Sequence, residues 1–98
     1  MSHSKKDDHS LSGALQEFIK RNKLQAGIDK VNARNAWETM MGAGVNRYTT
    51  LVELRKETLY VSLSSSVLRE ELSLGKSKII AMLNEELGRD LIKNLVLR

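Results

Sequence analysis

The sequence predicts an α+β domain in which a three-stranded sheet packs on helices. Three observations lead to this fold class. Apolar residues recur at helical spacing in the first half of the chain and again after the middle, the period falls to two between them, and the last segment is short and rich in branched apolar residues. The chain has 98 residues, of which 41% are hydrophobic and 29% charged, as in one globular domain with a modest core.

The N-terminus and the cysteine content narrow the class of protein. Residues 1–10 contain no apolar side chain after Met1, which predicts a flexible tail and a single domain over residues 11–98. No apolar run approaches the roughly 20 residues that span a bilayer, and the N-terminus lacks the apolar core of a signal peptide. We therefore expect a cytoplasmic protein without a membrane partner. Without cysteine, disulfides, thiolate metal sites and a cysteine nucleophile are excluded.

Two helices are predicted before the sheet. Apolar residues from Leu11 to Ile19 share one helical face, because they recur after four, seven and eight residues. A second run at helical spacing extends from Ile28 to Met41, after which Gly42 can supply the backbone that ends a helix. Trp37 could offer a stacking platform for a base. Its place within the second run favours a core anchor instead.

The segment "TTLVELRKETLYVSLSS" alternates apolar and polar residues. It predicts strands at about residues 50–55 and 58–64, joined by a polar Lys56-Glu57 step. Every second residue of the later strand is Leu or Val, so we expect one face of the sheet to be buried. Tyr48 and Tyr60 are then the aromatic residues expected to be exposed, although a strand tyrosine usually packs on a cross-strand partner.

The remaining elements are two helices and a strand. Residues 64–66 are serines that can cap a helix running to Leu74, Gly75 interrupts the pattern, and a further helix ends at Gly88. "LIKNLVLR" then predicts the last strand. Apart from the first helix, the order α-β-β-α-α-β is that of the type II KH fold, a nucleic-acid-binding module. The sequence therefore predicts a KH-like domain with an extra N-terminal helix.

No constellation of catalytic residues is present. Both histidines, His3 and His9, fall in the expected tail, so a Ser-His-Asp arrangement within the domain is unavailable. The carboxylate pairs Glu70-Glu71 and Glu85-Glu86 occupy adjacent helical positions, which diverge by about 100° and cannot flank one substrate bond. We expect a protein that is not an enzyme and that uses no cofactor and no metal.

Gly75-Lys76-Ser77-Lys78 is the segment best suited to hold a phosphate. A nucleotide P-loop would need glycine at position 70, where Glu70 stands, and a preceding strand instead of a helix. A KH domain has a short glycine-bearing loop between two helices, often Gly-x-x-Gly, that clamps a nucleic-acid backbone. The segment occupies that place, with Lys78 where the second glycine would be. It could equally be a simple helix break with solvated lysines.

The basic residues supply further candidates. Net charge is +4 and the pI is about 9.6, which favours a polyanionic partner. Arg69, Arg47 and Lys56 are secondary candidates for phosphate contacts. A further cluster of basic residues lies within fifteen residues that contain a single acid. It comprises Lys20, Arg21, Lys23, Lys30 and Arg34. We interpret the "KRNK" part of this cluster as cations at a helix C-terminus.

Three segments resemble the DciA family over residues 12–98: "AWETMMGAGVNRYT", "LYVSLSSSVLREEL" and "IIAMLNEELGRDLIKNLVLR". The matching positions are mostly core and capping residues: Trp37, Gly42, Thr49, Leu59, Val61, Leu68, Glu71, Leu72, Leu83, Asn84, Gly88 and Ile92. The resemblance implies a KH-like domain that binds DNA and assists loading of the DnaB-type replicative helicase. Better-understood members carry a basic C-terminal extension that contributes to these contacts, whereas the given sequence ends at Arg98.

We therefore expect a module that binds single-stranded or forked DNA and helps to recruit or load the helicase. Two alternatives stay open. The domain could be an RNA-binding regulator, since KH loops also read RNA. It could also be a protein-interaction adaptor that has lost nucleic-acid binding, as the missing second glycine and the acids Glu70 and Glu71 suggest.

Overall fold

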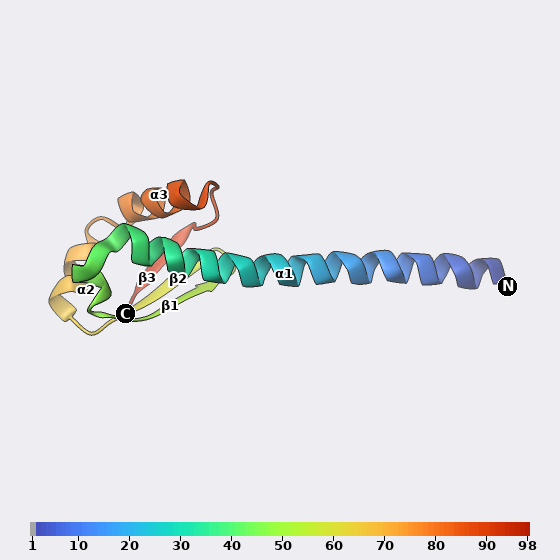
Figure 1. Cartoon of the computed structure of the whole chain (residues 1–98), viewed down its shortest axis with the longest axis horizontal. Helices are drawn as coiled ribbons and strands as arrows, with labels where there is room; N and C mark the ends of the chain where they lie inside the picture. The colour runs from blue at the N-terminus through green and yellow to red at the C-terminus, as the bar shows by residue number, and fades with distance from the viewer. Residues whose placement is uncertain (1) are drawn as a thin grey trace.

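The chain folds as a three-stranded sheet with two short helices and one very long one (Figure 1). The computed structural model describes the backbone of residues 2–98 and the side chains of residues 12–98. The elements follow in the order α1 (Ser2–Asn46), β1 (Thr49–Arg55), β2 (Thr58–Leu63), α2 (Ser66–Ser73), α3 (Lys76–Leu87) and β3 (Asn94–Leu97). This confirms the predicted α+β class and the KH-like order of elements.

The first helix is one element where the sequence predicted two. α1 continues through Gly27 and through Asn32 and Asn35, which lower helix propensity but, unlike proline, do not block a helix. It bends only at Gly42, whose φ of 78° and ψ of 176° suit glycine alone. The expected helix end is therefore a kink. α1 also includes the backbone of residues 2–10, where the sequence predicts a flexible tail; the flexibility of this segment stays a prediction.

The sheet has the order β1-β2-β3. β1 pairs antiparallel with β2 through the Lys56-Glu57 turn, in which Lys56 has a φ of 56°. β2 pairs parallel with β3 after the α2–α3 crossover. Ser65 caps α2 by accepting a hydrogen bond from the Leu68 N–H at 3.1 Å, and Gly88 ends α3 with a φ of 77°. The predicted cap and helix end are thus confirmed.

The core lies between one face of the sheet and the helices α1 and α3. Its buried apolar residues come from every element except α2: Ala33, Ala36, Trp37, Val52, Leu54, Leu59, Val61, Leu63, Ile79, Leu83, Ile92 and Leu95. Trp37 is fully buried, which confirms it as a core anchor. Its Nε1 donates to Thr49 Oγ1 at 3.2 Å, and Thr49 Oγ1 donates to the Val45 carbonyl at 2.9 Å. These bonds fasten the end of α1 to the start of β1.

Several apolar residues at helical spacing do not join this core. Val67 and Leu74 are 71% and 87% exposed, because α2 packs through its other face. Ile28 and Val31 are also exposed, since they project from the face of α1 opposite to the buried Ala33. Periodicity thus located the helical segments, two of which form one helix, but it did not show which apolar residues pack.

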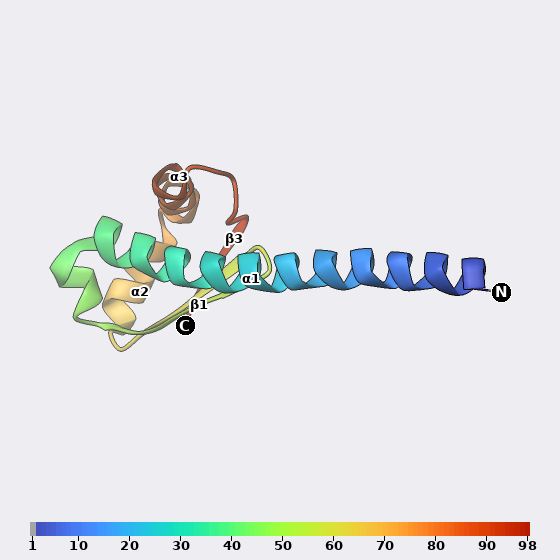
Figure 2. The same ribbon diagram turned by 45° about the vertical axis from the view of Figure 1, so that its right-hand side comes forward.

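The N-terminal half of α1 extends beyond the rest of the domain (Figures 1 and 2). The molecule measures 67 × 23 × 19 Å and has a radius of gyration of 19.0 Å. A compact chain of this length would have about 13 Å. Within the described residues, no helix combines the length and apolar character needed to cross a membrane.

Candidate nucleic-acid interface

The turn between α2 and α3 consists of Leu74 and Gly75. Both backbone N–H groups donate back into α2, from Leu74 to the Glu71 carbonyl at 3.2 Å and from Gly75 to the Leu72 carbonyl at 3.1 Å. The end of α2 is therefore satisfied by the chain itself, and α3 starts immediately afterwards at Lys76. This tight connection places the start of α3 at the surface.

The N-terminus of α3 carries unpaired backbone donors. Gly75 is the N-cap residue and offers no side chain to cap the helix. The first hydrogen bond within the helix runs from the Ile79 N–H to the Gly75 carbonyl at 3.0 Å. The N–H groups of Lys76, Ser77 and Lys78 therefore have no acceptor within the helix. Together with the positive end of the helix dipole, they favour an anion.

Gly75 leaves the space in front of this turn open. A Cβ atom built at Gly75 would meet no other atom within 4 Å, and its φ of −124° is accessible to any residue. Neither packing nor backbone conformation of the folded chain thus requires glycine here. Glycine at this position would, however, allow a ligand to approach the backbone closely.

The structure brings the four residues of the predicted phosphate segment together at this turn. Ser77 and Lys78 are exposed, whereas Gly75 and Lys76 are half-buried. Within residues 12–98, neither lysine forms a salt bridge. Their ammonium groups and the free N–H groups of α3 could contact the same phosphate group or adjacent ones. That they do so stays a prediction.

Arg69, Arg47 and Lys56 do not converge equally on the turn. Arg69 is half-buried and its Nη1 donates to the Leu63 carbonyl at 3.0 Å, so it holds the end of β2. Arg47 is exposed in the link between α1 and β1, at the same end of the sheet, because the Ser64 N–H bonds to the Tyr48 carbonyl at 2.8 Å.

Lys56 lies at the other end of the sheet, in the β1–β2 turn. Its neighbour Glu57 accepts hydrogen bonds from the N–H groups of Lys93 and Asn94, where β3 begins. α3 runs between the two ends and, at 12 residues, is about 18 Å long. Lys56 therefore does not belong to the α2–α3 turn and could act only on a separate surface.

An apolar and acidic strip borders the α2–α3 turn. Val67 and Leu74 lie seven residues apart and so share the exposed face of α2, which also carries the exposed acids Glu70 and Glu71. Their helical spacing predicted the helix but did not show that this face is exposed. Such a strip is typical of a contact with another protein.

The open face of the sheet carries an aromatic and cationic cluster. The guanidinium carbons of Arg55 and Arg98 lie 5.3 Å and 4.8 Å from the ring centroid of Tyr60. Arg55 also donates from Nε to Glu53 at 2.8 Å, and this hydrogen bond lowers the pKa of the Glu53 carboxyl and raises that of Arg55. Alternation in the strand predicted that Tyr60 lies on the open face of the sheet, where its side chain is half-buried, but no local pattern predicted the two arginines over its ring.

Asn84 holds the loop between α3 and β3 in place. Its Nδ2 donates to the Ile92 carbonyl and its Oδ1 accepts from the Ile92 N–H, both at 2.8 Å. Asn84 is only 8% exposed and is the one buried polar residue among those described. Its side chain thus replaces a pair of backbone hydrogen bonds where the chain turns toward β3.

The described part of the chain contains no group of three or more His, Cys, Asp or Glu side chains placed to hold a metal ion. Neither a search of characterised proteins nor one of solved structures gave a match. A family model described as "Dna[CI] antecedent, DciA" matches residues 10–97. This family is not a known catalytic one, and its description is consistent with a role in helicase loading. Since the match spans nearly the whole sequence, the chain belongs to the DciA family.

Proposed function

We propose that this domain is a non-enzymatic module that binds single-stranded or forked DNA in the cytoplasm and assists recruitment or loading of the DnaB-type replicative helicase. The observation that carries the DNA-binding part is the uncapped start of α3, where free N–H groups, an open glycine and two lysines lie together. Family membership supports the helicase part.

The turn is suited to a phosphate group and not to a base. Backbone N–H groups recognise phosphate oxygens without reading sequence, and lysines add charge without fixed geometry. Aromatic side chains that could stack on a base are absent from residues 66–80. Binding through this turn should therefore be weakly selective for sequence and strongly dependent on salt.

The experiment measures binding of single-stranded DNA, forked DNA and RNA oligomers by fluorescence anisotropy over a range of salt concentrations. Lys76→Glu combined with Lys78→Glu should weaken DNA binding and reduce the slope of log affinity against log salt by about 1.5, at roughly 0.7 per lost contact to a single strand. A charge-matched control carries Arg21→Glu and Lys93→Glu, both at exposed positions away from the turn. Equal binding by the parent and the folded turn variant would refute the assignment. Preference for RNA over matched DNA would favour the RNA-binding alternative.

A second candidate function is supported by the exposed Val67 and Leu74 beside Glu70 and Glu71. In this function the domain is an adaptor that binds the helicase through α2 without binding nucleic acid. Leu74→Ser should leave stability unchanged, because that side chain is 87% exposed. If the variant loses capture of purified DnaB-type helicase and the parent shows no oligonucleotide binding, the adaptor function is favoured.

A further inference from the structure

A row of cations runs along α1, away from the α2–α3 turn. Because α1 is continuous, the directions in which its side chains project follow from their spacing of about 100° per residue. Four cations project within about 80° of one another around the helix: Lys20 and the residues three, ten and fourteen positions after it, which are Lys23, Lys30 and Arg34. The row is about 21 Å long at 1.5 Å per residue. All four side chains are exposed, and none forms a salt bridge with any residue from 12 to 98. A helix C-terminus cannot explain them, since the helix continues for more than ten residues beyond Lys23.

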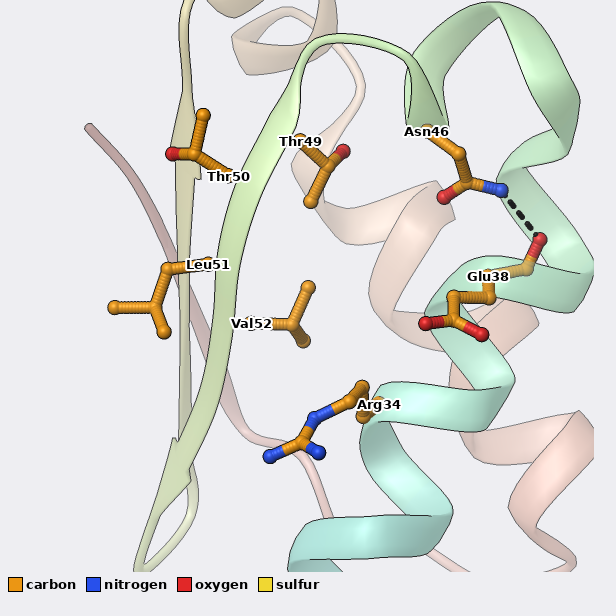
Figure 3. Close-up of a pocket in the computed structure, with 7 residues that line it drawn as sticks. All are labelled: Arg34, Glu38, Asn46, Thr49, Thr50, Leu51 and Val52. Atoms are coloured by element: carbon orange, nitrogen blue, oxygen red, sulfur yellow. Dashed lines mark hydrogen bonds between the residues drawn. The ribbon is translucent and has the colours of Figure 1, made fainter.

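The inner half of this row faces the outer edge of the sheet. Lys30 and Lys56 line a groove of about 340 Å³ together with Leu54, between α1 and the β1–β2 turn. Arg34 lines a neighbouring groove of about 490 Å³ between α1 and β1. Figure 3 shows the Arg34 guanidinium directed from α1 into this groove, toward the side of β1 from which Val52 projects. Lys56, which does not lie at the α2–α3 turn, thus lies beside the cations of α1.

The cations of the row outnumber the acids near it, and two of these acids are paired, whereas Glu17, three residues before Lys20, and Glu57, next to Lys56, form no salt bridge within residues 12–98. Asp29 forms a salt bridge with Arg89, and Glu53 forms one with Arg55. Glu38 projects into the groove beyond Arg34 and so limits the cationic stretch at its inner end (Figure 3). The balance from Lys20 to Arg34 and across to Lys56 is therefore strongly positive, and a polyanion complements it.

β1 contributes a further property of this surface. It is an edge strand, because the sheet order is β1-β2-β3, and an edge strand leaves a row of backbone N–H and C=O groups without sheet partners. A straight row of cations beside such an edge suits a flexible single strand that follows the groove. Each strand of a duplex instead winds around the helix axis, so its backbone can follow a straight row of cations for only a few phosphates.

We propose that Lys20, Lys23, Lys30, Arg34 and Lys56 form a second DNA contact, which binds the phosphate backbone of a single strand along the α1–β1 groove. This contact rests on the proposed function only in taking DNA as the partner, since it uses none of the residues of the α2–α3 turn. It also assigns a role to the basic cluster of α1 except Arg21, part of which the sequence analysis interpreted as cations at a helix C-terminus.

The test compares a triple variant, Lys23→Gln, Lys30→Gln and Arg34→Gln, with the parent in salt-titrated binding of a single-stranded DNA oligomer. The slope of log affinity against log salt should fall by about 2, at roughly 0.7 per lost contact. Arg21→Gln is the matched control, because Arg21 is exposed on the same helix but projects about 100° or more from each cation of the row. Single substitutions at Lys23, Lys30 and Arg34 should each weaken binding more than Arg21→Gln does. Circular dichroism confirms that every variant keeps its helix.

Two results would overturn the inference. One is a folded triple variant with the salt slope of the parent. The other is an equal loss for Arg21→Gln and the single row variants, which indicates only a general effect of net charge. A variant in which Lys76 and Lys78 are neutralised, measured in parallel, separates the two surfaces. If only that variant loses DNA affinity, the contact along α1 is refuted and the α2–α3 turn is not. If only the triple variant loses DNA affinity, the turn is refuted and the contact along α1 is not.

Discussion

Replacing Asn84 with alanine should destabilise the domain severely although it removes no apolar contact of the core. The substitution deletes both 2.8 Å hydrogen bonds to Ile92 and leaves the N–H and C=O of a residue with 0% exposure without partners. Each buried group left without a partner costs about 1–3 kcal/mol. We expect the free energy of unfolding to fall by about 2–4 kcal/mol, a large part of the roughly 5–15 kcal/mol of a small domain.

Urea denaturation followed by circular dichroism measures this change, and the melting temperature should fall by about 10–25 °C. Asn94→Ala is the matched control, because Asn94 is exposed and its side chain forms no hydrogen bond within residues 12–98. That control should stay within about 0.5 kcal/mol of the parent. Faster hydrogen exchange at the Ile92 amide should accompany the loss in Asn84→Ala. If the two variants prove equally stable, the Asn84 bonds do not hold the loop and the reasoning is wrong.

Three further predictions test the backbone, the core and the charges. Gly88→Ala should cost about 1 kcal/mol of unfolding free energy, because its φ is 77°, whereas Gly75→Ala should cost less and should weaken DNA binding more. Trp37→Ala should cost about 3–5 kcal/mol in the same denaturation assay, since the side chain is fully buried. The hydrogen bond from Arg55 lowers the folded-state pKa of Glu53, so the associated stability is present above the unfolded-state pKa and is lost as pH falls through the folded value. Arg55→Gln should remove this part of the acid dependence in urea titrations from about pH 6 to pH 3.

The sheet and the short helices could be predicted because their signals are local. Alternation predicted β1 and β2 within one residue of their bounds, the serines at 64–66 predicted the start of α2, and Gly88 predicted the end of α3, whereas the last strand is shorter than the predicted residues 91–98. The continuity of α1 could not be predicted in the same way. Gly27 and Asn32 weaken helix propensity locally, and only the packing of later turns on the sheet shows that the helix continues through them.

The residues of the candidate sites show the same difference between local and non-local signals. Gly75, Lys76, Ser77 and Lys78 are consecutive, so their common position followed from the order of elements. The groove beside β1 could not be found from the sequence, because Lys30 and Lys56 are 26 positions apart and meet only after the sheet has formed against α1. Arg69 shows another limit. Its predicted phosphate contact stays a prediction, but the sequence did not indicate that its guanidinium also donates to the Leu63 carbonyl at the end of β2.

The two proposed surfaces share a property that separates them from the rest of the domain, which is that neither serves stability. A serine at position 75 would cap α3, as Ser65 caps α2, yet the chain has glycine there and leaves the helix donors free. Lys20 and Lys23 repel each other on one face of α1, and neither forms a salt bridge within residues 12–98. Local choices that contradict the stability of a fold are expected where a ligand binds. Here they coincide with donors and cations at the surface, and a polyanion is the partner that would satisfy both.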